Sequence, residues 1–218
     1  MNFIRNNFKA LGHIFVIHTI LWFILFISGC RESPLLFRAG ADYFPLAAGN
    51  TWIYSRIEVD TSVIILKVIQ TESIEGRDSC WLLERNVSPE YWWKDEQGLD
   101  KLYLRTKFIS GDEITLANFW MPWLKLPLVL NNSWNVTFEQ SVKVLGDVIK
   151  TKAKVSGKVI ALEDDIYKVQ IELIEKDSST NFGFWCDTTV YYEWYEPNVG
   201  ITKRLYDNVE EYLVDYTL

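Results

Sequence analysis

The sequence of 218 residues predicts an all-β domain built from one antiparallel sheet. β-branched and aromatic residues dominate the chain from Thr51 onward, as is typical of strands. Turn signals recur about every 8–14 residues, and no stretch of helix length keeps a 3.6-residue apolar period. Connections this short do not allow parallel crossovers, so the strands are expected to form an antiparallel meander.

The first 29 residues have the pattern of a secretion signal helix. Arg5 and Lys9 are the only charges before the run Ile14–Gly29, which has no formal charge when His18 is neutral. A basic start followed by a short apolar core is typical of a signal. Sixteen helical residues cover roughly 24 Å, which is short of the roughly 30 Å hydrocarbon core of a bilayer.

The end of this segment, Ile27-Ser28-Gly29-Cys30, resembles the bacterial lipobox. The resemblance implies that the chain is cleaved before Cys30 and that diacylglycerol is attached to its sulfur. Two or three acyl chains such as palmitate would anchor the protein to a membrane permanently. The alternatives are an uncleaved anchor helix and plain secretion. Residues 30–42 would then be a lipidated tether, and residues 43–218 the β-rich domain.

Charge and histidine usage exclude several function classes. All 29 acidic residues but only 20 of the 22 basic ones follow residue 29, which gives the mature chain a formal charge of −9. This balance argues against nucleic acid and against electrostatic docking to anionic lipid. Both histidines, His13 and His18, lie in the signal. The mature chain therefore lacks a Ser-His-Asp or Cys-His mechanism and a histidine metal site. No metal or cofactor is expected.

Two cysteines remain in the mature domain besides Cys30. Cys80 and Cys186 each follow or precede a tryptophan within an apolar run. In an oxidising compartment an even pair indicates one candidate disulfide. The alternative is two buried free thiols, because unpaired cysteine packs as a small hydrophobic residue.

The clearest strand is 149–161, where every second residue from 150 to 158 is a lysine except Ser156. Residues 166–175 alternate in the same way, and an acidic turn at Glu163-Asp164-Asp165 joins the two into a hairpin. In this hairpin, lysines of 149–161 could face acids of 166–175. The strands expected from the pattern are 51–59, 62–71, 80–86, 99–108, 132–144, 149–161, 166–175, 186–195, 200–206 and 209–217.

One motif occurs twice. Pro45–Trp52 and Pro127–Trp134 share the pattern P-L-x-x-x-N-[TS]-W at an offset of 82 residues. Gly49 or Asn131 before the asparagine tolerates a left-handed turn. The motif indicates either two equivalent corners of a duplicated sheet or a common way of turning into a strand.

Three segments together resemble a group of uncharacterised bacterial lipoproteins. These are Tyr43–Tyr54, Leu126–Trp134 and Trp194–Arg204, which match the "YFPLxxGNxWxY" entry and "WYxxxVGxVK" exit of that group. The resemblance implies a curved half-barrel or open barrel, similar to lipoprotein carriers and lipocalins. It implies no activity and no catalytic residues.

The mature domain keeps nine of the ten tryptophans, and four of them are weak candidates for ligand binding: Trp92, Trp93, Trp120 and Trp123. Exposed aromatic rings stack on sugars or line apolar grooves, but large rings also fill a wide core. The apolar stretch 114–130, interrupted by Pro122 and Pro127, is either a lid over an apolar cavity or a buried strand pair. The acidic groups Asp112-Glu113, 163–165 and Glu193 are remote candidates for a two-carboxyl glycosidase.

These patterns predict a non-catalytic, lipid-anchored lipoprotein of the cell envelope, facing the periplasm or the cell exterior. It would bind an apolar ligand, a glycan or a protein partner. The alternative is a structural or assembly role in which the sheet docks another envelope protein.

Overall fold

The computed structural model describes residues 41–181 and 183–218, which lie within one compact unit, Arg38–Leu218. The predicted signal 1–29, the lipidation site Cys30 and the tether up to residue 40 lie outside the described residues. Among the described residues there is no helix long and apolar enough to cross a membrane.

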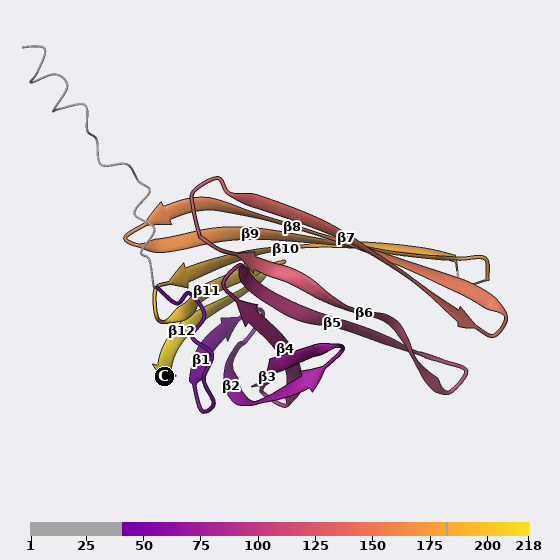
Figure 1. Ribbon diagram of the computed structural model, residues 1–218, viewed down its shortest axis with the longest axis horizontal. Helices are drawn as coiled ribbons and strands as arrows, with labels where there is room; N and C mark the ends of the chain where they lie inside the picture. The colour runs from indigo at the N-terminus through magenta and orange to yellow at the C-terminus, as the bar shows by residue number, and fades with distance from the viewer. Residues whose placement is uncertain (1–40, 182) are drawn as a thin grey trace, which may run out of the picture. The chain divides into compact units, whose positions relative to one another are not determined.

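Twelve strands account for most of the described chain (Figure 1). They are β1 (Thr51–Ile57), β2 (Thr61–Ile74), β3 (Arg77–Arg85), β4 (Ser88–Asp95), β5 (Gly98–Ile109), β6 (Asp112–Lys125), β7 (Ser133–Val144), β8 (Asp147–Glu163), β9 (Ile166–Ser179), β10 (Gly183–Glu196), β11 (Gly200–Tyr206) and β12 (Val209–Thr217). The all-β prediction is confirmed.

All twelve strands belong to one antiparallel sheet in the order β6-β5-β4-β3-β2-β1-β12-β11-β10-β9-β8-β7. The sheet curves until its two edge strands, β6 and β7, meet through side chains. The backbone N–H of Asn118 donates to Gln140 Oε1 at 2.9 Å, and the rings of Phe119 and Phe138 stack with their centres 4.4 Å apart. The predicted open barrel is therefore confirmed, and it is nearly closed.

The sequence pattern missed two strands, β4 and β6. β4 is short and contains Pro89, which disfavours a strand. In β6 the register shifts opposite Arg105/Thr106 and Leu99/Asp100, so Leu116 and Trp123 are extra residues. These bulges place consecutive side chains in the interior and break the period-two pattern. The stretch 114–130 is thus mainly a paired strand whose apolar side chains enter the core, and it is not a lid over a cavity.

The predicted hairpin of β8 and β9 is confirmed, but its charge pairing is different. Lys150, Lys152, Lys154 and Lys158 are exposed on one face, as the alternation requires. Opposite them on β9 stand no acids, because Lys152 lies across from Lys176 and Lys154 from Ile174. The acid partner is on the other neighbour, since Lys152 Nζ lies 2.6 Å from Glu139 Oε1 on β7.

The repeated motif forms two corners with the same hydrogen bonds. Each corner leads into the first strand of six, β1–β6 or β7–β12, and the two halves join head to tail in the sheet. In both corners the residue before the asparagine has a positive φ, 97° at Gly49 and 70° at Asn131. The equivalent pairs are Gly49 N→Val68 O and Asn131 N→Val159 O, Val68 N→Asn50 O and Val159 N→Asn132 O, and Asn50 Nδ2→Pro45 O and Asn132 Nδ2→Pro127 O. The interpretation of two equivalent corners fits this geometry.

The main core lies at the end of the barrel where the chain enters, here called the proximal end. Asp42 is already part of the domain there, because its backbone carbonyl accepts from Asn198 N at 2.6 Å and its carboxylate from Lys94 Nζ at 2.5 Å. Phe44 stacks on Trp52, whose indole N–H donates to Val199 O at 2.7 Å. Both halves of the chain contribute to this core.

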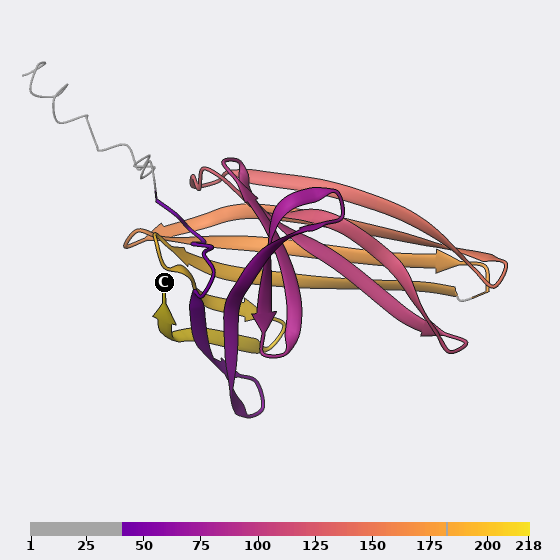
Figure 2. The ribbon, with the colours of Figure 1, turned by 60° about the horizontal axis from the view of Figure 1, so that its bottom comes forward.

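The strands β5 to β10 extend away from this core to a second end, here called the distal end (Figures 1 and 2). The hairpin turns β5–β6, β7–β8 and β9–β10 lie there. A smaller apolar cluster of Ile109, Leu116, Val144 and Ile149 joins the first two hairpins.

A candidate binding cleft at the distal end

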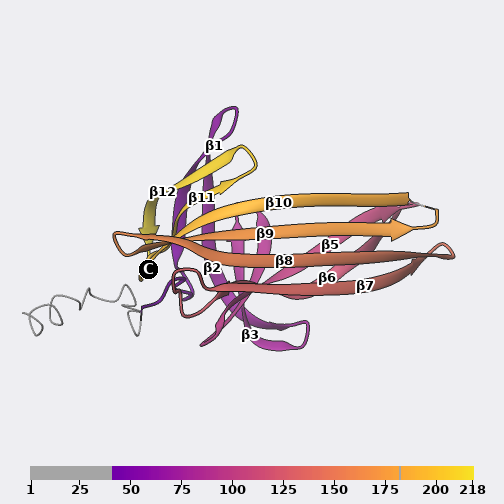
Figure 3. The ribbon, with the colours of Figure 1, turned by 90° about the horizontal axis from the view of Figure 1, so that it is seen from above.

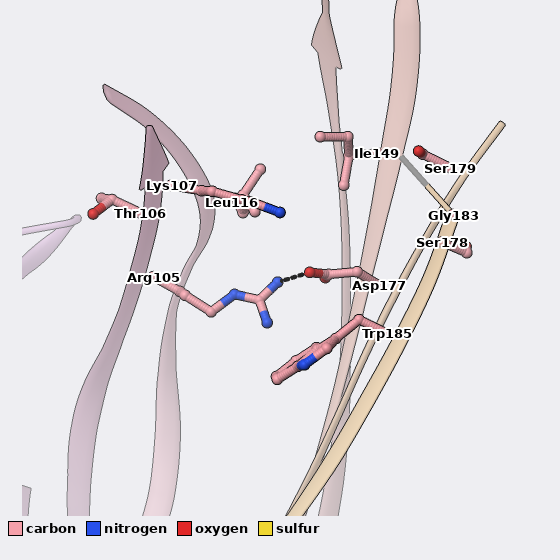
Figure 4. Close-up of a pocket in the computed structure, with 10 residues that line it drawn as sticks. All are labelled: Arg105, Thr106, Lys107, Leu116, Ile149, Asp177, Ser178, Ser179, Gly183 and Trp185. Carbon is pink, nitrogen blue, oxygen red and sulfur yellow. Dashed lines mark hydrogen bonds and ion pairs between the residues drawn. The ribbon is translucent and has the colours of Figure 1, made fainter. Parts of the chain in front are cut away.

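A cleft of about 230 Å³ opens between the walls of the barrel at the distal end (Figure 4). One wall comes from β5 and β6, and the other from β8, β9 and β10. The lining residues are Arg105, Thr106, Lys107, Leu116, Ile149, Asp177, Ser178, Ser179, Gly183 and Trp185.

The bulge in β6 shapes the first wall. Because Leu116 is the extra residue opposite Arg105/Thr106, it and Ala117 are both buried, and Leu116 packs with Ile149 below the cleft. Bulges redirect neighbouring side chains and often lie beside functional sites. Here the Arg105 side chain reaches across to the opposite wall.

Arg105 connects the two walls through charge and ring contacts. Its guanidinium makes a short ion pair with Asp177, whose other oxygen accepts from Thr151 Oγ1 at 2.8 Å. The guanidinium carbon lies 4.9 Å from the centre of the Trp185 ring. Figure 4 shows the three side chains converging. Arginine favours such sites because its planar group pairs with carboxylates and stacks on rings.

Glu175 adds a carboxyl group that is poorly compensated. Its Oε1 is buried without a hydrogen-bond partner, and the nearest Arg105 nitrogen is 3.6 Å away. On the neighbouring strand Asp187 stands directly opposite. Burial, together with the charges of Asp187 and Asp177, raises the pKa of Glu175 to about 7. This carboxyl group therefore exchanges its proton near neutral pH.

The four tryptophans proposed as weak ligand-binding candidates do not line this cleft. Trp92 and Trp123 are buried in the main core, with their rings edge to face at 6.3 Å. Trp93 and Trp120 lie on either side of the Arg77 guanidinium, 4.3 and 4.9 Å from it. Arg77 also pairs with Asp100 at 2.7 Å. Trp92 and Trp123 therefore fill the core, whereas Trp93 and Trp120 are half-buried and lie against Arg77 outside it.

The two cysteines are free thiols in the structure. Cys80 is buried on β3, and burial raises the pKa of its thiol. Cys186 is exposed on β10. Four strands, β2, β1, β12 and β11, separate β3 from β10 in the sheet order. The structure therefore has two separate thiols, one buried and one exposed, in place of the candidate disulfide.

Among the acidic candidates, Glu193 is the informative one. Asp112, Glu113 and the turn 163–165 are at hairpin ends, whereas Glu193 is completely buried in β10. Its carboxylate accepts from Arg204 Nε at 2.6 Å, from Trp123 Nε1 at 2.9 Å and from Tyr195 Oη at 2.5 Å. Glu193 thus forms an internal ion pair with Arg204, and Trp123 and Tyr195 donate further hydrogen bonds to its carboxylate.

Asp177 is the carboxylate that lines the cleft, and it is held by Arg105 and Thr151. Glu175 on the same strand has an unsatisfied, buried oxygen but is not among the lining residues. A two-carboxyl glycosidase needs both groups facing a substrate. Within residues 41–181 and 183–218, no cluster of three or more His, Cys, Asp or Glu side chains is placed to hold a metal ion.

Sequence reasoning missed Arg105, Asp177 and Trp185. Arg105 and Asp177 are 72 residues apart, and nothing in either strand pattern connects them. The one available signal was the inward alternation of 166–175, which continues through Glu175 to Asp177 and places two acids on the interior face.

Comparisons of the chain with protein-family models, with curated proteins and with solved structures found no match.

Proposed function

We propose that this chain is a non-catalytic lipoprotein of the cell envelope, anchored through acylated Cys30, that binds a protein partner in the distal cleft. The lipobox-like segment that ends at Cys30 supports the lipid anchor. The absence of histidine after residue 29 supports a function that does not use histidine chemistry. The described chain enters the barrel at the proximal end, and the cleft opens at the distal end.

The observation that supports a protein partner is the pairing of Arg105 with Trp185 at the mouth of a small cleft. Arginine and tryptophan are the residue types that dominate binding energy in protein interfaces. Trp185 lines the cleft and is still 43% exposed, so its ring is accessible to a partner at the mouth.

The size of the cleft also favours a partner side chain over a whole apolar ligand. Pockets that enclose small-molecule ligands hold roughly 300–1,000 Å³, and this cleft holds about 230 Å³. Toward the proximal end the interior is filled by aromatic side chains and by the Glu193 ion pair. The structure thus supports a lipid-carrier function less well than a docking function.

Site-specific photo-crosslinking in living cells tests this proposal. A photoreactive phenylalanine analogue at position 185 or 107, both of which line the cleft, is expected to form adducts with one envelope protein. The same group at Val63, which is 60% exposed on β2, is the control for random contact. Arg105→Ala is expected to weaken the adduct at 107 at least tenfold.

Three outcomes are informative. A single protein adduct that depends on Arg105 supports the proposal. An adduct with the mass of a lipid would replace the protein partner by an apolar ligand. Equal or absent crosslinking at 185, 107 and 63 would contradict binding at this cleft altogether.

A further inference from the structure

The outer face of β7, β8 and β9 carries an excess of positive charge that the net charge of the chain hides. Along β7, β8 and β9 the outward positions hold seven lysines and three glutamates, and the exposed β8–β9 turn adds Asp164 and Asp165 at the proximal end. The lysines are Lys143, Lys150, Lys152, Lys154, Lys158, Lys168 and Lys176, and the glutamates are Glu139, Glu163 and Glu172. The four lysines of β8 form a row with neighbours about 7 Å apart, except where Ser156 interrupts it.

A groove of about 370 Å³ crosses this row. Lys154 and Lys158 line it, together with the polar side chains of Asn135 and Gln170 and the acidic side chain of Glu172. The Oγ of Ser156, which also lines the groove, is buried and has no hydrogen-bond partner. Two ammonium groups together with hydroxyl and amide donors suit a phosphate group, and they outnumber the single carboxylate.

Apolar side chains are exposed at the distal end of the same face. Leu145 in the β7–β8 turn is 72% exposed, and Phe184 on β10 is 71% exposed. Phe184 shares the outward face because it pairs with Ser178, whereas Trp185 pairs with Asp177 on the cleft side. Val148 at the start of β8 is also exposed. Figure 3 shows β7 to β10 side by side from this side of the sheet.

We propose that this outer face, the basic face, lies against an anionic bilayer surface. Its lysines would contact lipid phosphates, and Leu145, Val148 and Phe184 would enter the interfacial region. Basic residues combined with exposed apolar side chains are the usual composition of a surface that binds anionic membranes. The cleft opens on the opposite side of the same strands, so the two surfaces can be occupied together.

The net charge of −9 for the mature chain disfavours docking to anionic lipid, but this charge is unevenly distributed over the surface. Three further acids of the same strands, Glu175, Asp177 and Asp147, are on the interior side or buried and do not face the lysines. An electrostatic field at a surface depends on the charges that face it within about 8–10 Å at physiological salt. The basic face is therefore attracted to anionic lipid although the whole chain is acidic.

Lysine acylation of the full protein in nanodiscs tests the proposal. The chain is purified from the membranes of cells that express it and is reconstituted in discs of phosphatidylglycerol or of phosphatidylcholine. Lys150, Lys152 and Lys154 are expected to react about tenfold more slowly in the anionic discs, as measured by peptide mass spectrometry. Lys67, exposed on β2, is the internal control and is expected to react equally in both.

Salt and a charge variant identify the cause. Salt at 0.5 M is expected to remove the protection, because electrostatic attraction is then screened. In a variant with Lys150→Gln, Lys152→Gln and Lys154→Gln, Lys158 and Lys176 are expected to lose their protection in anionic discs. Lys67→Gln is the matched control and is expected to keep it.

Equal reaction rates in the two kinds of disc would overturn the proposal. Protection that persists in detergent would also overturn it, since it would indicate a protein covering the face. Both results leave crosslinking from position 185 unaffected, because that position faces the cleft. A failure here is therefore distinct from a failure of the proposed function.

Discussion

Arg204 holds two buried carboxylates in the interior of the barrel. Glu193 and Glu211 are both completely buried, and the guanidinium lies 2.6 Å from the first and 3.2 Å from the second. Arg85 on β3 makes a further short contact with Glu211 on β12. Burial opposes ionisation of Glu211, but Arg204 and Arg85 outweigh it and lower the pKa of that carboxyl. Arg204 pairs with the residues directly opposite it on β10 and β12, whereas the Arg85–Glu211 pair connects β3 and β12, which are not neighbours in the sheet.

Replacing Arg204 by methionine is therefore expected to be severely destabilising. The change leaves two buried carboxylates without their main counterion, which costs about 3–5 kcal/mol. Arg56→Met is the matched control, because the Arg56–Glu58 pair is at the surface, and it is expected to cost less than about 1 kcal/mol. Urea unfolding measures both. Equal losses for the two variants would contradict a structural role for the buried network.

Glu175 makes the stability depend on pH in the opposite direction from a salt-bridged acid. The folded protein keeps this proton up to about pH 7, whereas an ordinary glutamate loses it near pH 4.5. The folded state thus binds more protons in this interval, and stability falls as pH rises through it.

Glu175→Gln is expected to remove that loss. At pH 4 the variant and the natural protein should be equally stable, because both side chains are neutral. At pH 8 the variant should be more stable by about 1–2 kcal/mol, with allowance for solvent screening. Urea unfolding at the two pH values measures the difference. A gain of the same size at both values would show that charge is not the cause.

At the scale of elements, the meeting of β6 and β7 depends on one tryptophan. The Trp134 ring lies against Gly157 on β8, and its N–H donates to Pro122 O on β6 at 3.0 Å. A Cβ at position 157 would lie 2.1 Å from the indole. The glycine therefore provides the space that lets the ring close the barrel.

Gly157→Ala is expected to displace this ring and destabilise the protein by about 1–3 kcal/mol. The same substitution in a Trp134→Ala background is expected to cost little, because the ring is gone. Thermal or urea unfolding of the four proteins gives the coupling between the two positions. Additive costs would contradict the proposed contact.

The two corners of the repeat offer a matched comparison. Asn50 is buried and its side-chain amide donates to Pro45 O at 3.0 Å, whereas the equivalent Asn132 is half-buried and makes a longer, exposed hydrogen bond to Pro127 O at 3.4 Å. Asn50→Ala is expected to cost about 1–3 kcal/mol and Asn132→Ala less than about 1 kcal/mol in urea unfolding. A larger loss for Asn132→Ala than for Asn50→Ala would contradict the view that burial decides how much each of these hydrogen bonds stabilises its corner.

The sequence predicted those elements whose alternation is regular. β8 has one wet face along most of its length, so its lysines identified it directly. β6 was not recognised as a strand because bulges at Leu116 and Trp123 and the residue Pro122 break the period of two. The cleft could not be predicted, because the curvature of the whole sheet brings Arg105 to Asp177. The alternation of residues in a strand shows which side chains share one face of that strand. It does not show which distant strands the curved sheet brings together.

At the scale of the whole molecule, the two ends of the barrel differ in character. The proximal end contains the main aromatic core and the entering chain, whereas the distal end contains the cleft and the exposed apolar turns. The proposed anchor, the basic face and the cleft would together hold the domain at a membrane while one side remains available to a partner. Each of these assignments depends on the chain reaching the cell envelope.

The mass of the amino-terminal peptide tests this central claim most directly. The protein is purified from membranes of the cells that express it, digested, and measured by mass spectrometry. The account predicts a first residue Cys30 that carries a diacylglycerol group on its sulfur, with or without a further acyl chain on its amine. A chain that begins at Met1 and carries no fatty acid would contradict it.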